Sequence, residues 1–346
     1  MTVRRGTAAA IALLFVAALA AAGCGIGPGE GRGDVELTIT RDYGAELLLR
    51  RSVGDVTESD TVIRVLDRST EITTRYGGAF VQSIAGIEGE LQDGRPHDWF
   101  FYVNGLWSPV GAADYPLRGG ERIWWDYRDW SVGERVAAAV GSWPQPFVDG
   151  YEGKRRAVAV ECLGGGEACA EVRSRLEATG ARITPAGGPK KGDIGPSEAH
   201  RGVPGGAMRV LVGPWARLRR DPDARQIEDG PRASGVFADF VPRSKTTKKD
   251  RSAVGFPRIA GKTNSGRFEL WGFGPGGEAV RAFGPGVGLV AATRRYDAPP
   301  VWVVTGVTTG GVRAAAKLLN IDDLRDHYAV ATEGGEETPL PLDGLR

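Results

Sequence analysis

Histidine is scarce in this sequence. The 346 residues include three, His97, His200 and His327, and each stands apart from the others. A catalytic or structural metal site needs clustered ligands or an HExxH helix, and neither pattern occurs. We therefore predict no metal site.

The sequence also lacks the common signatures of catalysis and nucleotide binding. No GxSxG elbow is present, and the glycine-rich loop at 306–311 is neither a Walker loop nor a GxGxxG fingerprint. A Ser/His/Asp triad stays an alternative, because the three residues of a triad come together in the fold and need not be close in the sequence. Asp126 and Asp129 carry the chemistry of a general acid and base, although we favour surface charges for both. We predict no catalytic residues and no enzyme, with a hydrolase in the C-terminal half as the alternative.

An excess of charge is absent as well. The formal net charge is +1, and removing residues 1–23, which hold two arginines and no acids, changes it to −1. Such a chain gives no electrostatic case for binding nucleic acid. The basic run 243–251, RSKTTKKDR, is either a contact for anionic lipid or wall polymers or, as we favour, a solvated loop.

The longest apolar run is short. Residues 8–20 follow Arg4 and Arg5, which is typical of an export signal and too short for a confident membrane span. LAAAGC, ending at Cys24, resembles the lipobox of bacterial lipoproteins, although Ala21 stands where leucine is usual. We predict a signal peptide at 1–23, lipidation of Cys24 and a flexible tether at 24–33, with a plain secretory signal as the alternative. The mature protein is then an extracytoplasmic lipoprotein of the cell envelope, on the outer side of the cytoplasmic membrane.

Besides Cys24, cysteine occurs at positions 162 and 169. An exported protein experiences oxidising conditions, and the intervening LGGGEA links a predicted strand end to a helix start. We predict a disulfide between Cys162 and Cys169. A metal or catalytic thiol pair is the alternative, but no histidine lies nearby.

The remaining 323 residues predict two domains joined by a linker at 132–155, in which 132–140 forms a short helix. Hydrophobic alternation and turn residues predict strands at 34–40, 46–53, 80–84, 99–103 and 122–127, with a helix capped by Ser59 or Asp60. A helix crossing a mixed sheet is a β-grasp-like layout, at 34–131. The overall class is α+β.

For the second domain, 156–335, the sequence predicts an α/β fold with a mixed sheet, followed by a tail at 336–346. Strand–loop–helix patterns occur at 156–179 and 300–320, a strand follows at 327–331, and 268–273 pairs with 278–283. The glycine-rich stretch 185–207 is predicted as a loop. Between strand and helix, GVTTGG at 306–311 is either an anion-binding loop or a tight connection.

Aromatic residues are concentrated in 98–130, which holds five of the nine tryptophans. Alternation places Trp99, Phe101 and Val103 on one side of a strand and Phe100 and Tyr102 on the other. Asn104-Gly105 suits a tight hairpin turn. The rings are either core or, in part, a recognition surface, because a sheet covered on one face does not need large rings on both.

These motifs carry a resemblance. LTITRDYGAELL, TVIRVLDR, YGGAFVQSIAGI and the aromatic block WFFYVNGLWSPVGAADYPLRGGERIWWDYRDW resemble the transcobalamin C-terminal-like family over about residues 34–131. In the animal vitamin carriers such a domain closes over a corrinoid held against a helical barrel. The resemblance implies a β-grasp fold and a small-molecule ligand such as a corrinoid, or contact with a membrane transporter. No second half of the barrel type is evident in this chain.

The ligand site predicted on the aromatic block consists of Tyr102, Asn104, Trp107, Tyr115, Trp124 and Tyr127. For Asn104, a turn role is the simpler interpretation. Three hypotheses follow: a lipoprotein accessory to cobalamin-like uptake, a structural or interaction protein of the envelope whose aromatic face docks a protein or the second domain, and a hydrolase. No cofactor is predicted apart from the corrinoid ligand.

Overall fold

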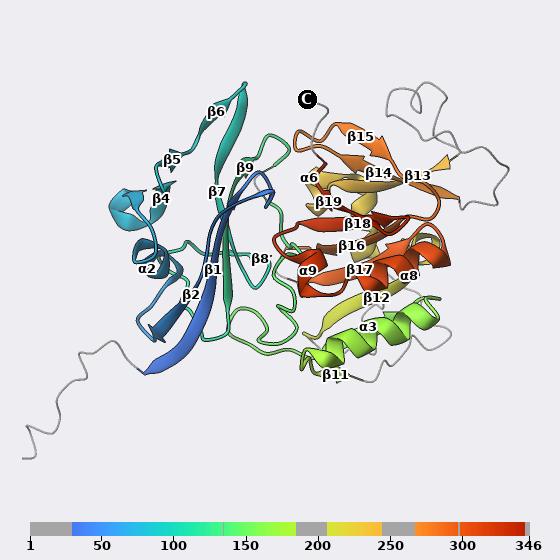
Figure 1. Ribbon diagram of the computed structural model, residues 1–346, viewed down its shortest axis with the longest axis horizontal. Helices are drawn as coiled ribbons and strands as arrows, with labels where there is room; N and C mark the ends of the chain where they lie inside the picture. Colours follow the sequence, from blue (N-terminus) through green and yellow to red (C-terminus); the bar gives the residue numbers. More distant parts are fainter. Residues whose placement is uncertain (1–29, 134, 185–205, 244–266, 297, 343–346) are drawn as a thin grey trace, which may run out of the picture.

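A computed structural model describes residues 30–133, 135–184, 206–243, 267–296 and 298–342. Within these ranges the chain is mostly strand, arranged in several sheets, with few helices (Figure 1). This composition agrees with the predicted α+β class. Cys24, residues 1–29 and most of the basic run 243–251 and of the loop 185–207 lie outside the described residues.

The N-terminal half, residues 30–129, is built on one sheet with the strand order β2-β1-β9-β7-β6, and β8 also pairs with β7. Its strands are β1 (Gly31–Arg41), β2 (Glu46–Thr57), β6 (Glu90–Gln92), β7 (Arg95–Val103), β8 (Leu106–Trp107) and β9 (Arg122–Asp129). Strands β1 and β9 run parallel, and the other pairs are antiparallel. In this register Trp124 lies between Thr38 and Tyr102, which confirms that the aromatic strands are neighbours.

One face of this first sheet packs on a helix and a small sheet. The covering elements are α2 (Val62–Asp67), β3 (Ile72–Arg75), η1 (Tyr76–Gly78), β4 (Phe80–Ile84) and β5 (Ile87–Glu88). Leu37, Ile39 and Trp125 share a buried core with Val65 and Leu66. The predicted cap of α2 is wrong: Thr61 begins the helix without a side-chain cap. The Asp60 carboxylate instead accepts a hydrogen bond from the Thr57 amide (2.8 Å) and pairs with Arg68 (2.7 Å).

The C-terminal half, residues 158–342, is built on a seven-stranded sheet with the order β11-β10-β12-β17-β16-β18-β19. Its strands are β10 (Val158–Cys162), β11 (Ile183–Thr184), β12 (Met208–Pro214), β16 (Gly288–Thr293), β17 (Val301–Gly306), β18 (Ala329–Glu333) and β19 (Glu336–Leu340). Strands β11, β10, β12 and β17 are parallel, and β16, β18 and β19 join antiparallel. The sheet is mixed, as predicted, and residues predicted as a tail include β19.

Two layers cover this second sheet. Helices α3 (Glu167–Ala178) and α8 (Thr309–Lys317) pack on one face, where Val172 and Val312 join a core with Val210. The other face carries α4 (Trp215–Leu218), α5 (Pro222–Arg225), η2 (Gln226–Asp229), α6 (Pro231–Ser234) and the sheet β13 (Ala238–Pro242), β14 (Phe268–Phe273) and β15 (Ala279–Ala282). A last short helix, α9 (Ile321–Leu324), precedes β18. No helix among the described residues is long and apolar enough to cross a membrane.

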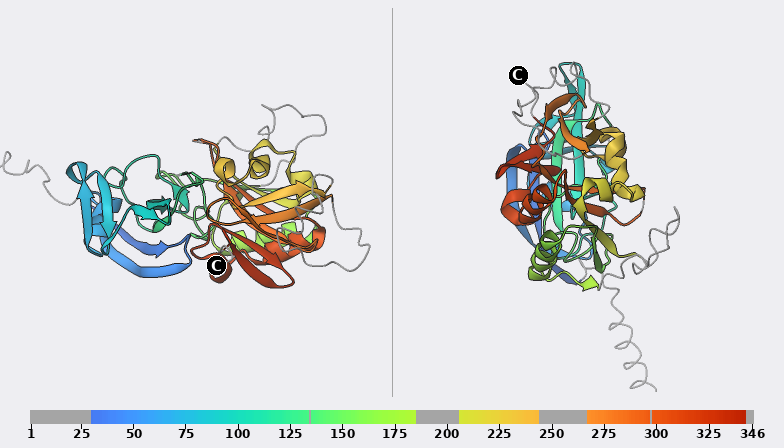
Figure 2. Two further views of the ribbon diagram at one scale, coloured as in Figure 1. Left: turned by 90° about the horizontal axis from the view of Figure 1, so that it is seen from above. Right: turned by 90° about the vertical axis from the view of Figure 1, so that its right-hand side faces the viewer.

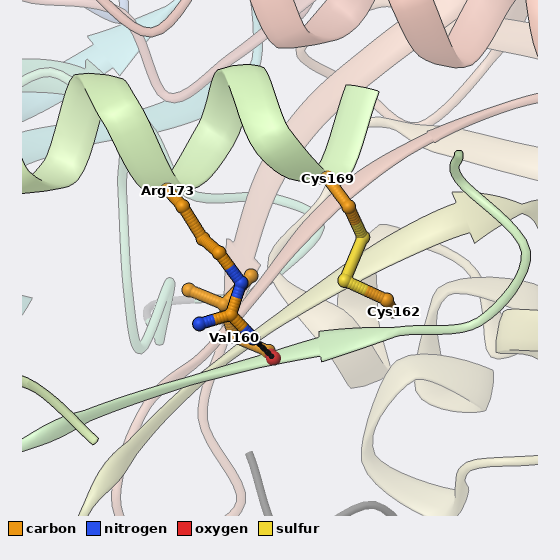
Figure 3. The surroundings of a disulfide bond; sticks show 4 residues. All are labelled: Val160, Cys162, Cys169 and Arg173. Atoms are coloured by element: carbon orange, nitrogen blue, oxygen red, sulfur yellow. Dashed lines mark hydrogen bonds between the residues drawn. A yellow bond between two sulfur atoms is a disulfide. The ribbon is translucent and has the colours of Figure 1, made fainter. Parts of the chain in front are cut away.

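The predicted disulfide between Cys162 and Cys169 is present (Figure 3). It joins the end of β10 to the first turn of α3, with the two Cα atoms 5.9 Å apart. Arg173 adds a second tie, because its guanidinium donates to the Val160 carbonyl at 3.0 Å. The intervening loop needs glycine, since a Cβ at Gly165 would lie 3.0 Å from Val212.

The segment between the halves is packed rather than a free linker. Trp143 and Phe147 form a three-ring group with Trp302 of β17, with Phe147 and Trp302 centroids 4.8 Å apart. The helix predicted at 132–140 is wrong for the described residues of that stretch. The chain there is not helical, and Ala138 bridges to Leu106.

The two halves lie side by side (Figures 1 and 2) and share a core along one contact, the seam cluster, which consists of Tyr43, Tyr102, Trp124, Phe237 and Tyr328. The Tyr328 ring lies 5.0 Å from the rings of Tyr43 and Trp124 and 5.6 Å from that of Tyr102. The first sheet is therefore covered on both faces, by α2 on one side and by the C-terminal half on the other.

A substitution at Gly44 tests how closely the two halves pack at the seam. The φ of Gly44 is +84°, and a Cβ there would clash with the Asp326 carbonyl oxygen of the C-terminal half. Gly86 has a similar φ of +79° and open space around it. We expect Gly86→Ala to lower the free energy of unfolding by about 1–2 kcal/mol through backbone strain, and Gly44→Ala by about 2–5 kcal/mol. Denaturant unfolding measures both, and equal losses would contradict the tight seam contact.

Candidate functional site

The six predicted ligand residues do not come together in one place. Tyr102, Trp107 and Trp124 belong to the core shared with the C-terminal half, whereas Tyr115 and Tyr127 lie in the core under α2. All except Trp107, which is half-buried, are buried. The alternation predicted for β7 is correct, and both faces find partners within the chain, which agrees with the alternative in which the aromatic face docks the second domain. Ligand binding by these six residues stays a prediction.

Asn104 has a structural role at the turn between β7 and β8. Its φ of +53° and that of Gly105, +76°, form the predicted hairpin turn. The side-chain amide donates to the Gly150 carbonyl at 2.7 Å and accepts from the Arg122 amide at 2.9 Å. The turn and the packed segment after it are thereby held together, and Asn104 is fully buried.

Asp126 and Asp129 are not the surface charges that we predicted. Asp126 is fully buried and accepts hydrogen bonds from the hydroxyls of Thr40 (2.6 Å) and Tyr328 (2.9 Å). Burial raises the pKa of Asp126 to about 6, against the opposing effect of these hydrogen bonds. Asp129, 4% exposed, accepts from the Ser131 amide at 2.7 Å. The alternation pattern gave no sign of either burial.

Arg128 supplies the positive charge of this buried region. Its guanidinium lies 3.9 Å from the centroid of the Phe100 ring and 5.5 Å from that of Tyr43, and it donates to the Asp129 carbonyl at 3.3 Å. Burial lowers its pKa, but the neighbouring tyrosines 102, 328 and 43 outweigh that effect and raise it. The seam is therefore polar as well as aromatic, with Asp126 bonded across it to Tyr328.

The loop 306–311 is a tight connection between β17 and α8. The Thr308 hydroxyl accepts from the Gly311 amide at 3.2 Å and caps the helix. A Cβ on Gly306 would lie 2.7 Å from Gly311. These contacts support the simpler of the two interpretations of this loop.

The candidate site is a cleft of about 1230 Å³ at the edge of the seam. The N-terminal half contributes its β1–β2 turn, its β6–β7 turn and the end of β9. The C-terminal half contributes the β14–β15 turn, His327 and the end of β19. The lining residues are Arg41, Asp42, Tyr43, Gly44, Ala45, Glu46, Gln92, Asp93, Arg95, His97, Asp129, Pro275, Glu278, His327, Thr338, Pro339, Leu340, Pro341 and Leu342. In Figure 1 the β1–β2 turn (blue) reaches toward β19 (red) in this region.

Two tight turns position the N-terminal wall. Asp42, Tyr43 and Gly44 all have positive φ, between +55° and +84°, which reverses the chain sharply after β1. The reversal directs Tyr43 to the seam, where its hydroxyl donates to the Asp129 carbonyl at 2.6 Å. Burial raises the pKa of Tyr43, so this hydroxyl stays a donor at all ordinary pH. Asp93 and Gly94, also at positive φ, turn the chain between β6 and β7.

The cleft carries charged groups of both signs beside apolar proline and leucine residues. Arg41 pairs with Glu46 at 2.6 Å, and Arg95 lies 3.4 Å from the Asp129 carboxylate. Burial lowers the pKa of His327. This imidazole is therefore neutral near pH 7 and offers a donor and an acceptor rather than a charge. The arrangement suits binding of a polar small molecule.

Sequence reasoning missed most of the cleft. Asp42-Tyr43-Gly44 was interpreted as a turn, and nothing in the local pattern links it to His327 or to Glu278, which lie more than two hundred residues away in the sequence. Among the described residues, no three histidine, cysteine, aspartate or glutamate side chains are grouped to hold a metal ion.

The fold and the cleft define an α+β protein with a ligand-sized cavity between its two halves. Residues 59–129 match a family model described as "Domain of unknown function (DUF4430)". The matched region lies within the segment 34–131 that carries the family resemblance. A search of curated proteins gave no match.

Two solved structures resemble part of the chain. One is of a "putative metal binding protein" from Ruminococcus gnavus, with 12% identity and a TM-score of 0.23, covering 28% of this chain and 97% of that one. The other is haptocorrin in complex with Cbi, with 15% identity and a TM-score of 0.23, covering 29% of this chain. The match spans 26% of haptocorrin. At these TM-scores neither structure supports a conclusion about this chain.

Glu121 provides a pH test beside the predicted residue Tyr115. It is 3% exposed, accepts from the Arg118 amide at 2.9 Å, and contacts the Tyr115 hydroxyl at 3.3 Å. Burial raises its pKa to about 7 from the ordinary 4.5. The folded state thus favours the protonated form, so its contribution to stability is complete below about pH 4.5 and is lost as the pH rises through 7.

Glu121→Gln keeps the shape and removes the titration. We expect the variant to be more stable than the native protein by roughly 1–3 kcal/mol at pH 8, and the difference to disappear by pH 4. Urea unfolding at several pH values measures it. Parallel stability profiles for the two proteins would contradict the raised pKa.

Proposed function

We propose that the protein binds a small molecule in the cleft between its two halves. The supporting observation is the cleft itself: at about 1230 Å³ it is large enough for a sizeable ligand, and both halves line it. Its walls offer carboxylates, guanidiniums and a neutral imidazole close to apolar proline and leucine side chains. Such a combination is typical of sites that orient a ligand with a few polar groups.

A corrinoid is the first ligand to test. The resemblance of residues 34–131 to the transcobalamin C-terminal-like family supports this choice, together with delivery to a membrane importer as the role. In the animal carriers the partner of this domain is a helical barrel. Here the opposite wall is formed by the β14–β15 turn and the end of β19, so the proposal concerns a differently built site.

We further propose that the protein is held at the outer side of the cytoplasmic membrane by a lipid on Cys24. The signal-like sequence 1–23 and the lipobox-like residues before Cys24 support this location. Five residues separate Cys24 from Glu30, where the described structure begins. The cleft would then be displayed close to the membrane, where an importer could accept its ligand.

A second candidate function is a structural role in the cell envelope without a small ligand. The seam cluster favours it, because the aromatic face that suggested recognition is covered by the C-terminal half of the same chain. In that case the N-terminal half is a docking module, and its partner is the C-terminal half of the same chain.

Narrowing the cleft tests the first proposal. Ala45 is exposed in the β1–β2 turn and lines the cleft, whereas Ala170 is exposed on α3. We expect cobinamide or cobalamin at 100 times its Kd to stabilise the native protein and Ala170→Trp by about 2.7 kcal/mol, and Ala45→Trp much less. Thermal unfolding with and without ligand measures this. Absence of any shift would exclude corrinoids, and an equal shift in Ala45→Trp would place the ligand elsewhere.

Cys24→Ser tests the membrane anchor. The serine hydroxyl cannot take the thioether-linked diacylglyceryl group, so we expect the variant to leave the membrane fraction when expressed in a lipoprotein-processing bacterium. Fractionation and mass measurement of the N-terminal peptide provide the readout, with Cys162→Ser/Cys169→Ser as the control that retains the anchor. A native protein found in the soluble fraction would contradict the proposal.

A further inference from the structure

The cleft has an excess of negative charge. Five carboxylates and two guanidiniums line it: Asp42, Glu46, Asp93, Asp129 and Glu278 against Arg41 and Arg95. Counting the carboxylates and guanidiniums alone, two positive and five negative charges leave a net charge of −3. A concave wall of low dielectric concentrates the field of such charges, so the cleft attracts cations more strongly than an open surface does.

Both resident cations are already engaged by carboxylates of the cleft. Arg41 lies 2.6 Å from Glu46 and 3.7 Å from Asp42, and Arg95 lies 3.4 Å from Asp129. Among the described residues, neither Asp93 nor Glu278 has an ion-pair partner. Because Arg41 is shared by Asp42 and Glu46, the N-terminal wall keeps two of the three unbalanced negative charges, and Glu278 places the third on the C-terminal wall.

Arg95 marks the place where a cation is accommodated. Its side chain is about half exposed, and its guanidinium lies near Gly276 of the β14–β15 turn. A Cβ on Gly276 would lie 2.8 Å from the Arg95 guanidinium and 2.7 Å from the Glu278 carboxylate. The guanidinium thus stands between the buried Asp129 of one half and Glu278 of the other, and the absence of a side chain at Gly276 leaves room for it.

We propose that the ligand of the cleft carries an ammonium or guanidinium group that binds between Asp129 and Glu278, at the place that Arg95 holds in the free protein. The inference rests on the proposed binding of a small molecule in the cleft, and it names a ligand class other than a corrinoid, whose side chains end in amides. A cation entering this place is attracted by both carboxylates and is opposed by Arg95. Asp129 and Glu278 therefore favour binding of the cation, and Arg95 disfavours it.

Two charge-neutralising variants separate these effects. The probes are spermidine, with ammonium groups, and agmatine, which adds a guanidinium; citrate and glucose represent anionic and neutral ligands. We expect Arg95→Gln to tighten cation binding roughly threefold to tenfold and Glu278→Gln to weaken it by a similar factor. Isothermal titration calorimetry at fixed ionic strength measures both. Lys317→Gln and Glu177→Gln, which remove exposed charges from α8 and α3, should leave the affinity unchanged.

The outcomes distinguish this inference from the function on which it rests. Opposite shifts in Arg95→Gln and Glu278→Gln, with unchanged controls, support the cationic ligand. Shifts in the same direction, or shifts equal to those of the controls, overturn it. If citrate or glucose binds in a manner that Ala45→Trp abolishes, the cleft is a ligand site but the cationic class is wrong. If no probe and no corrinoid binds, the proposed function fails as well.

Discussion

The contact of Tyr328 with the first sheet is the interaction on which the rest of the structure depends. Its ring fills the space between Tyr43 and Trp124, and its hydroxyl donates to the carboxylate of Asp126 at the centre of β9. Without a cover, this sheet face would expose the large apolar area of these rings and the carboxylate of Asp126 to water. The C-terminal half supplies the cover, so the core on this face of the first sheet is shared by the two halves.

The same contact creates the cleft. The seam holds the β1–β2 turn against the C-terminal half through Gly44 and Asp326, while the chain on either side diverges toward the β6–β7 and β14–β15 turns. Residues that close the seam, such as Tyr43, therefore also line the cavity. A ligand that contacts both walls stabilises the arrangement of the two halves, because it binds most tightly when the seam is closed.

The aromatic block shows why a high content of aromatic residues predicted more ligand-binding surface than the structure leaves exposed. A sheet with large rings on both faces implies two partners, and the sequence suggested an internal core for one face and a ligand, a protein or the second domain for the other. Both partners belong to the chain: α2 and its neighbours cover Trp125 and Tyr127, and Phe237 and Tyr328 cover Trp124 and Tyr102. The polar side chains that are available to a ligand lie instead at the edge of the seam cluster, in the turns that line the cleft.

Local patterns determined much of the secondary structure of this protein. Alternation predicted β1, β7 and β9, Asn104-Gly105 predicted a turn, helical spacing predicted α3 and α8, and the cysteine spacing predicted the disulfide, because each depends on residues close in the chain. Tertiary structure alone decided the burial of Asp126 and Asp129, the packing of 141–154 on Trp302, and the approach of Arg95 and Glu278 to Gly276 from two different halves of the chain. These features arise from contacts between residues as far apart as Asp126 and Tyr328, and no local periodicity encodes which distant surface covers a strand.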